Sequence, residues 1–207
     1  MAIQVLLVQH GEKVASAGDP GLTAVGRRQA AAVASWLAEH HPDIEFIWAS
    51  PLRRARETAA SIGAALQLEV RTDARLRERM NWDDTAIDLD GFLSEWKRAS
   101  ADRTYQPTNG DSASEAARRF TAALADIEEL TGEGTIVVVA HGGVTVDTLR
   151  SLVGDEAVNA ADPDLIDNGV PSCAITELRV DAGGVAVDAY PSTIHLPVDE
   201  TTRHRPA

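Results

Sequence analysis

Two kinds of hydrophobic pattern alternate along this chain. Three short runs are almost entirely apolar: Ile3–Val8, the stretch EFIWAS at 45–50 and the stretch TIVVVA at 135–140. Runs of this length are typical of β-strands buried on both faces, as in the middle of a parallel sheet. Two further strand-like stretches, CAITELRV at 173–180 and GVAVDAY at 184–190, flank a glycine turn near the C-terminus. We therefore expect a sheet of several strands.

Between these runs, apolar residues recur at spacings of three and four, which is the pattern of a helix that packs by one face. One such segment covers Thr23–His40. A second begins at Pro51, where Ser50 suits the N-cap and proline suits the first helical position. A third begins with the capping box formed by Ser112 and Glu115.

The alternation of strands and helices predicts a three-layer α/β/α sandwich with a largely parallel central sheet. We find no internal repeat and no linker, so we expect a single domain over residues 1–207. Residues 80–109, which include MNWDD and the turn-rich YQPTNGD, fit neither pattern. We interpret them as a cap-like excursion over the mouth of the sheet.

Composition and charge narrow the function classes. Apolar residues make up 44% of the 207 residues and charged residues 25%, as in an ordinary globular protein. The net charge of -13 disfavours nucleic acid and anionic membranes as partners. No stretch approaches the roughly 18 apolar residues of a membrane helix, and Ile3–Val8 is too short for a signal peptide. With Cys173 as its single cysteine, the protein is expected to be cytoplasmic and free of disulfides.

Candidate chemistry lies at the ends of the predicted strands. The runs VLLVQHG and VVVAHGG each deliver a histidine, His10 and His141, followed by glycine. The helix after FIWAS carries three arginines in the segment PLRRARET. Because the carboxyl ends of parallel strands form the ligand crevice of an α/β sheet, these groups predict an anion site, aided by the N-terminus of the Pro51 helix. Structural histidines, solvated arginines and glycines that only permit turns remain the alternative.

Six motifs occur in an order that resembles the histidine phosphatase superfamily, the phosphoglycerate mutase-like proteins. They are VQHGE, LTAVGRRQA, SPLRRARETA, LRER, GDSASEAARR and VVVAHGG, and they span roughly residues 3 to 180. The resemblance implies the phosphoglycerate mutase-like fold and a phosphohistidine mechanism without cofactor or metal ion. Its ligand would be a small phosphorylated substrate.

The same resemblance implies roles for individual residues. His10 matches the nucleophile that attacks phosphorus, Arg54 matches the arginine that grips the phosphoryl oxygens, and His141 matches the second histidine of the site. Glu78 falls where the family has the proton donor for the leaving oxygen; the alternative is an exposed salt bridge to a neighbouring arginine. The residues expected to bind the phosphate or substrate alongside Arg54 are Gln9, Gly11, Thr23 and Gly142.

One position departs from the family, which has Arg-His-Gly where this chain has Gln9, His10 and Gly11. A glutamine donates hydrogen bonds but brings no charge. A hydrogen bond to a charged group is worth about 1–2 kcal/mol more than a neutral one, so the substitution predicts roughly a 5- to 30-fold loss. Lys13 or Arg53 is a candidate to restore the charge; for both, a solvated side chain is the alternative.

We therefore expect a phosphomonoesterase, weakened but still active. Two other functions stay open. A phosphomutase shares the catalytic core, although the segment EKVASAGDPG is short for a substrate-enclosing loop. A pseudophosphatase that binds a phosphorylated ligand or partner without turnover is supported only by Gln9. The identity of the substrate and the oligomeric state are not predicted.

Overall fold

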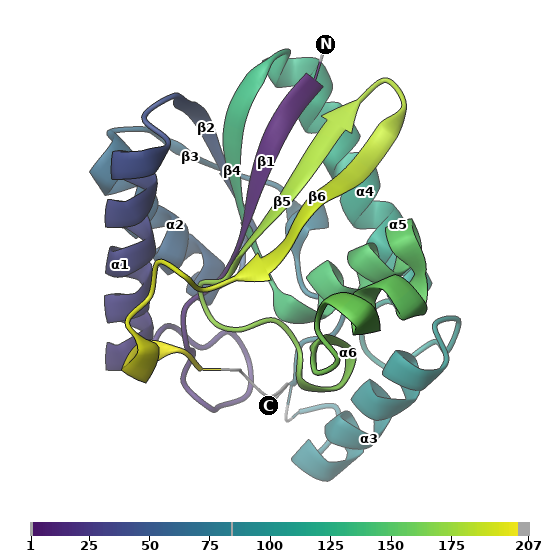
Figure 1. Cartoon of the computed structure of the whole chain (residues 1–207). Helices are drawn as coiled ribbons and strands as arrows, with labels where there is room; N and C mark the ends of the chain where they lie inside the picture. The colour runs from purple at the N-terminus through teal and green to yellow at the C-terminus, as the bar shows by residue number, and fades with distance from the viewer. Residues whose placement is uncertain (1, 84, 203–207) are drawn as a thin grey trace.

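The computed structural model describes residues 2–83 and 85–202, which form a six-stranded sheet with helices on both faces (Figure 1). The order of the strands across the sheet is β3-β2-β4-β1-β5-β6. Their bounds are β1 Ala2–Gln9, β2 Ile44–Ala49, β3 Val70–Thr72, β4 Gly134–Ala140, β5 Ile175–Asp181 and β6 Gly184–Ser192.

The sheet is largely parallel, which confirms the prediction. β3, β2, β4 and β1 pair in parallel, whereas β5 is antiparallel to both β1 and β6. β1 and β4 lie in the middle of the sheet and pair from Ile3 with Gly134 to Gln9 with Ala140. They are nearly all apolar because both of their faces are covered.

Four long helices make the outer layers. Figure 1 shows α1 (Ala24–His40) and α2 (Arg53–Leu66) on one side of the sheet and α4 (Ala113–Thr131) and α5 (Gly142–Ala161) on the other. Each side has its own apolar cluster, with Phe120 among the largest buried side chains. The expected three-layer α/β/α sandwich is therefore the observed fold.

Two predicted helix starts have different outcomes. The capping box of α4 is present, since Ser112 Oγ accepts from the Glu115 N–H and Glu115 Oε2 accepts from the Ser112 N–H. The helix expected to begin at Pro51 begins instead at Arg53, and its cap position has no side-chain cap. The hydroxyl of Ser50, the predicted N-cap, lies 2.7 Å from an imidazole nitrogen of the site described below.

Residues 80–109 contain helix α3 (Leu89–Ala101), which lies beyond the lower edge of the sheet in Figure 1, where β1 and β4 end. α3 has a small apolar cluster of its own, formed by Met80, Phe92 and Ala99. The short helices are η1 Ala74–Leu76, α6 Leu165–Asn168 and η2 Val198–Glu200.

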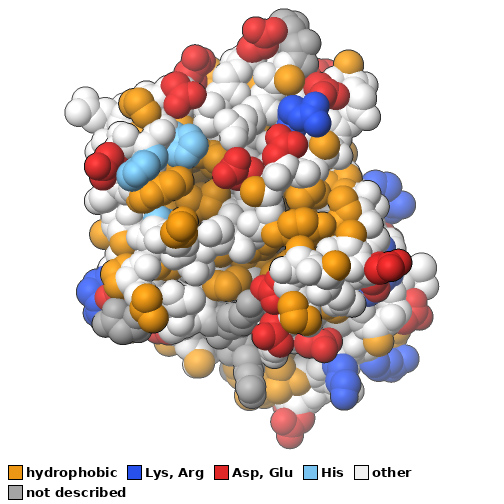
Figure 2. Space-filling model, viewed as in Figure 1, with side chains coloured by type: hydrophobic (Ala, Val, Ile, Leu, Met, Phe, Trp, Pro, Cys, Tyr) orange, Lys and Arg blue, Asp and Glu red, His pale blue; other side chains and the backbone are white. Residues whose placement is uncertain are grey.

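Acidic side chains are spread over the face shown in Figure 2, in keeping with the negative net charge. Cys173 is fully buried within one apolar cluster, and burial raises the pKa of its thiol. No helix among residues 2–83 and 85–202 is both long and apolar enough to cross a membrane.

Candidate active site

Three parallel strands end side by side at one edge of the sheet. The residues that directly follow β1, β2 and β4 are His10, Ser50 and His141. The rings of His10 and His141 meet edge to face with their centroids 5.2 Å apart. A cavity opens at this edge, and its wall includes His10 and Arg54. The predicted meeting of two imidazoles and a guanidinium is therefore present.

His10 is almost completely buried, and its two ring nitrogens have different neighbours. Nδ1 lies 2.7 Å from the carbonyl oxygen of Gly11. Because a carbonyl only accepts, Nδ1 must carry the ring proton in this arrangement. Nε2 then keeps its lone pair, which accepts a hydrogen bond from Arg54 Nε at 3.2 Å. The nitrogen with the lone pair therefore lies against a cation.

Arg54 is 3% exposed, and it links this imidazole to the cap segment. Besides its bond to His10, it donates from Nη1 to Asn81 Oδ1 at 3.2 Å. Burial lowers the pKa of Arg54, and the negative charges of Glu78 and Asp19 oppose that shift. A guanidinium keeps its charge at neutral pH even so, which leaves a buried cation suited to an anionic ligand.

The loop after His10 is tied to α2 and α1. The Gly11 N–H donates to Thr58 Oγ1 at 3.0 Å, and the Thr58 hydroxyl donates to the carbonyl of Arg54 at 2.9 Å. A Cβ on Gly11 would lie 2.5 Å from the carbonyl oxygen of Gly26 in α1, closer than atoms can pack. Gly11 does not line the cavity. Its observed role is close packing of the loop, with its N–H already donated to Thr58.

His141 has a different environment, because it is fully buried and outside the cavity wall. Its Nε2 lies 2.7 Å from Ser50 Oγ, whose lone pair accepts from the Leu52 N–H at 3.3 Å. Within the described residues, Nδ1 of His141 has no hydrogen-bond partner. Burial, reinforced by the positive charge of Arg54, lowers the pKa of His141 well below 6.5. The ring is therefore neutral at physiological pH.

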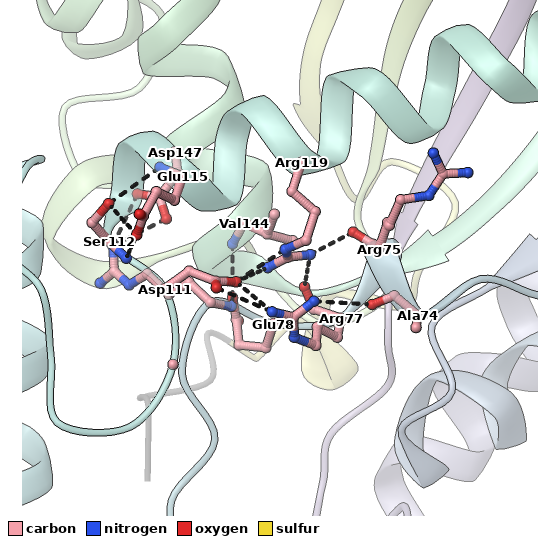
Figure 3. A network of polar contacts seen from close by, with 12 residues as sticks. Ala74, Arg75, Arg77, Glu78, Asp111, Ser112, Glu115, Arg119, Val144 and Asp147 are labelled. Carbon is pink, nitrogen blue, oxygen red and sulfur yellow. Dashed lines mark hydrogen bonds and ion pairs between the residues drawn. The ribbon is translucent and has the colours of Figure 1, made fainter.

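The carboxylate of Glu78 lies at the N-terminus of α5. Oε2 accepts from the Gly143 N–H at 2.9 Å, and Oε1 accepts from the N–H groups of Val144 and Arg79, both at 2.8 Å. Figure 3 shows the carboxylate directed at Val144. Glu78 lines the cavity, and the salt bridges of the neighbouring arginines go to other carboxylates. The alternative of an exposed salt bridge is therefore wrong.

A polar network holds the backbone that carries Glu78 (Figure 3). Arg119 of α4 donates to the carbonyl oxygens of Arg75 and Arg77. Arg77 and Arg119 both pair with Asp111, at 2.8 and 2.7 Å. Glu78 lies in a segment that belongs to no helix or strand and so lacks regular backbone hydrogen bonds. The network therefore fixes the position from which Glu78 enters the cavity.

Gln9 and Gly142, two of the residues predicted to bind the phosphate or substrate, both line the cavity. The Gln9 side chain is 4% exposed, and its Oε1 has no hydrogen-bond partner among the described residues. A Cβ on Gly142 would lie 3.6 Å from Gln9 Nε2, which places the amide beside the start of α5. Gln9 therefore occupies the site without contributing charge.

Two other expected contributors lie elsewhere. Thr23 is not part of the cavity wall; its hydroxyl caps α1 through the Gly26 N–H at 2.9 Å and donates to Glu12 at 2.6 Å. The N-terminus of α2 is not open to a ligand, because Asp19 Oδ1 accepts from the Arg53 N–H at 2.7 Å. The pull on an anion expected from this helix end is therefore offset by a carboxylate of the chain itself.

Sequence reasoning missed the far wall of the cavity. Arg79 and Asp147, 3% and 0% exposed, form an ion pair at 2.9 Å, and Trp96 of α3 stacks on the Arg79 guanidinium at 4.1 Å. Burial raises the pKa of Asp147 to about 6, although Arg79 opposes the shift. The two partners are 68 positions apart, and no local pattern links them. Across the described ranges, no group of three or more His, Cys, Asp and Glu side chains is placed to hold a metal ion.

The fold and the site define an α/β protein that gathers two histidines and one buried arginine at the ends of its parallel strands. The sequence profile of the histidine phosphatase superfamily (branch 1) matches residues 5–193. The chain therefore belongs to this superfamily.

Known relatives include both phosphatases and mutases. A probable phosphoglycerate mutase of Yersinia enterocolitica is 34% identical over 164 residues, which cover 73% of this chain and 75% of that protein. Glucosyl-3-phosphoglycerate phosphatase of Mycobacterium tuberculosis is 32% identical over 165 residues, 69% of this chain and 72% of the relative. The native structure of a mycobacterial glucosyl-3-phosphoglycerate phosphatase superposes with a TM-score of 0.73 at 26% identity, covering 93% of this chain and 100% of that one.

Proposed function

We propose that this protein is a phosphomonoesterase that hydrolyses a small phosphorylated substrate through a phosphohistidine on His10, without a metal ion or cofactor. The observation that carries the proposal is the pair of bonds at His10. Its Nδ1–H donates to Gly11, and its Nε2 lone pair lies 3.2 Å from Arg54 Nε. A phosphoryl group that entered between them would meet a neutral nucleophile and a cation together.

In the first step, Nε2 of His10 attacks phosphorus and the P–O bond to the alcohol breaks. The electron pair of that bond goes to the ester oxygen, which takes a proton from Glu78 and leaves as the free alcohol. Arg54 donates to the equatorial oxygens. His141 donates as well, from the Nδ1 atom that has no partner among the described residues, while its Nε2 lone pair accepts from the Ser50 hydroxyl and is not available for attack.

In the second step, water attacks the phosphohistidine and its proton goes to the Glu78 carboxylate. The P–N bond breaks, its electron pair returns to Nε2, and inorganic phosphate leaves. Glu78 is protonated again and His10 is neutral, so the cycle closes with one water consumed. No group outside the chain is needed to balance it.

A phosphomutase is the second candidate, because one of the relatives is a probable phosphoglycerate mutase. The same phosphohistidine would then return its phosphoryl group to another hydroxyl of the substrate rather than to water. With 3-phosphoglycerate as substrate, a mutase forms 2-phosphoglycerate faster than inorganic phosphate. A phosphatase releases inorganic phosphate as the main product.

Hydrolysis of p-nitrophenyl phosphate in the presence of EDTA tests the proposal. Wild type should release p-nitrophenol. With an alkyl phosphate such as 3-phosphoglycerate, Glu78→Gln should lower kcat by about 10²–10⁴-fold because the poor alkoxide leaving group loses its acid, whereas p-nitrophenolate leaves largely without that acid. Activity that appears only after a divalent metal is added would refute the metal-independent mechanism. Silence from wild type together with turnover by Gln9→Arg would point to a pseudophosphatase.

A further inference from the structure

Four cationic side chains line the cavity, and three of them are bonded to other side chains of the protein. Arg79 pairs with Asp147 at 2.9 Å, Arg150 pairs with Asp155 at 2.7 Å, and Arg54 is bonded to His10 and Asn81. The fourth is Lys13. No hydrogen bond or ion pair joins its ammonium group to any other residue within 2–83 and 85–202.

Lys13 is nevertheless buried, with 9% of its surface exposed. Its backbone is fixed by a β-bridge to Leu22, and the neighbouring Glu12 N–H donates to Gln29 of α1 at 2.8 Å. Burial and the positive charge of Arg54 lower the pKa of Lys13 to about 8. The chain therefore keeps an ammonium group at the cavity without a carboxylate of its own, which is costly unless a ligand supplies the negative charge.

Arg53, the other candidate to restore the charge, does not reach the site. Its side chain is 60% exposed, pairs with Glu57 at 2.6 Å and is absent from the cavity wall. Gln9, which directly precedes His10 in the sequence, lines the same cavity but carries no charge. Only Lys13 among these three both carries a charge and lines the cavity.

We propose that Lys13 binds the phosphoryl group of the substrate and supplies the second positive charge that Gln9 does not. In the family the positive charge is on the arginine directly before the histidine, whereas in this protein it would be on Lys13, three positions after His10. This inference rests on the proposed function only in that the cavity takes a phosphoryl group; it does not require turnover. The rival assignment places Lys13 on a carboxylate in the alcohol part of the substrate.

Inorganic phosphate separates the two assignments, because it has no alcohol part. Its Kd should be measured by isothermal titration calorimetry at pH 7, where Lys13 is mostly protonated. Loss of a charged hydrogen bond worth about 1.5–3 kcal/mol predicts that Lys13→Met raises Kd about 10- to 100-fold. The matched control is Lys97→Met, the only other lysine of the chain, which is exposed on α3 and should leave Kd within about 2-fold of wild type.

A charge swap then tests replacement rather than simple loss. Gln9→Arg introduced into Lys13→Met should recover at least about tenfold of the lost affinity, because the guanidinium restores the missing charge. A Kd within about 2-fold of wild type in Lys13→Met, or a double variant no better than Lys13→Met, would overturn the proposal. Failure of wild type to bind phosphate at all would overturn it as well.

Competitive acetylation of wild type gives a second readout that needs no variant to fold. Bound phosphate should slow the reaction of Lys13 with acetic anhydride while leaving Lys97 unchanged, as measured by peptide mass spectrometry. Equal rates at Lys13 with and without phosphate would contradict the proposal. Neither measurement uses turnover, so a catalytically silent protein that protects Lys13 would refute the phosphatase function and leave this inference standing.

Discussion

The ends of β1 and β4 have nearly the same sequence pattern, an apolar strand followed by histidine and glycine, yet they place their histidines in different environments. Gln9 and Ala140 pair across the two strands, so His10 and His141 start from equivalent positions. His10 lines the cavity with its Nε2 against Arg54. His141 is fully buried with its Nε2 against Ser50.

The neighbouring elements cause this difference. Arg54 of α2 contacts the ring after β1, whereas the ring after β4 precedes α5 and lies under the loop that carries Ser50. The end of the strand therefore determines the position of each histidine, and the neighbouring elements determine which hydrogen bonds its ring nitrogens make. We assign His10 as nucleophile and His141 as a neutral donor, and the predictions below test this division from the largest expected effect to the smallest.

Replacing His10 should have the largest effect. His10→Ala removes the nucleophile while the cavity keeps Arg54, so kcat for p-nitrophenyl phosphate should fall by about 10³-fold or more with folding unchanged. Steady-state kinetics and far-UV circular dichroism check this. If His10→Ala kept more than a tenth of wild-type kcat, the two histidines would not differ as described.

Replacing His141 should have a smaller effect. His141→Ala removes one donor to the developing charge, and loss of such a donor costs about 10²–10³-fold in kcat. The phosphoenzyme should still form, only more slowly, which rapid-quench kinetics can show. A complete loss of phosphoenzyme in His141→Ala together with its retention in His10→Ala would reverse the assignment.

The stability of the protein should depend on pH through His141. Its pKa is lowered in the folded protein, so the unfolded chain binds the proton more readily below pH 6.5. The associated stability is complete above pH 6.5 and is lost as pH falls, by up to about 1.4 kcal/mol per pH unit. Urea unfolding at pH 7.5 and 5.5 should show a larger loss for wild type than for His141→Asn.

Asp147 acts in the opposite direction, because the pKa of its carboxyl is raised to about 6 and its protonation favours the folded state as pH falls. Wild type and His141→Asn both contain Asp147, so the effect of Asp147 cancels when their losses of unfolding free energy are compared. An equal loss of stability in wild type and His141→Asn would show that His141 is not held neutral by burial.

Replacing Ser50 should have the smallest effect. Ser50→Ala removes the hydroxyl that lies 2.7 Å from His141 Nε2 and leaves the ring itself in place. One hydrogen bond of about 1 kcal/mol corresponds to roughly a 5-fold decrease in kcat. A decrease as large as that of His141→Ala would mean that Ser50 fixes the ring completely.

The sequence was sufficient for the parts of the molecule that depend on local pattern. Apolar strands ending in histidine and glycine located His10 and His141, and a single spacing identified the capping box of Ser112. The same local rule failed at Ser50, an ideal N-cap by residue type, because its hydroxyl instead contacts an imidazole 91 positions away. The preference of serine for the N-cap was therefore outweighed by the contact between Ser50 and His141.

Long-range contacts also explain what could not be predicted at the site. Glu78 stands in an irregular segment whose place depends on Arg119 and Asp111, far along the chain. Lys13 and Arg53 are both cationic residues close behind a strand, and only the tertiary packing buries Lys13 in the loop after β1 while Arg53 at the start of α2 stays exposed. The segment near the C-terminus contributes as well, since Gln29 donates to the carbonyl oxygen of Glu200 and accepts from the Glu12 N–H in the loop after His10.

The central claim is that His10 carries the phosphoryl group, and trapping that intermediate tests it most directly. Wild type mixed with a ³²P-labelled phosphate monoester and quenched in alkali should retain label as an acid-labile, alkali-stable phosphoramidate. Peptide mapping should place that label on His10, and His10→Ala should retain none. Steady turnover with no trapped label on His10, or equal labelling of His10→Ala, would contradict the account.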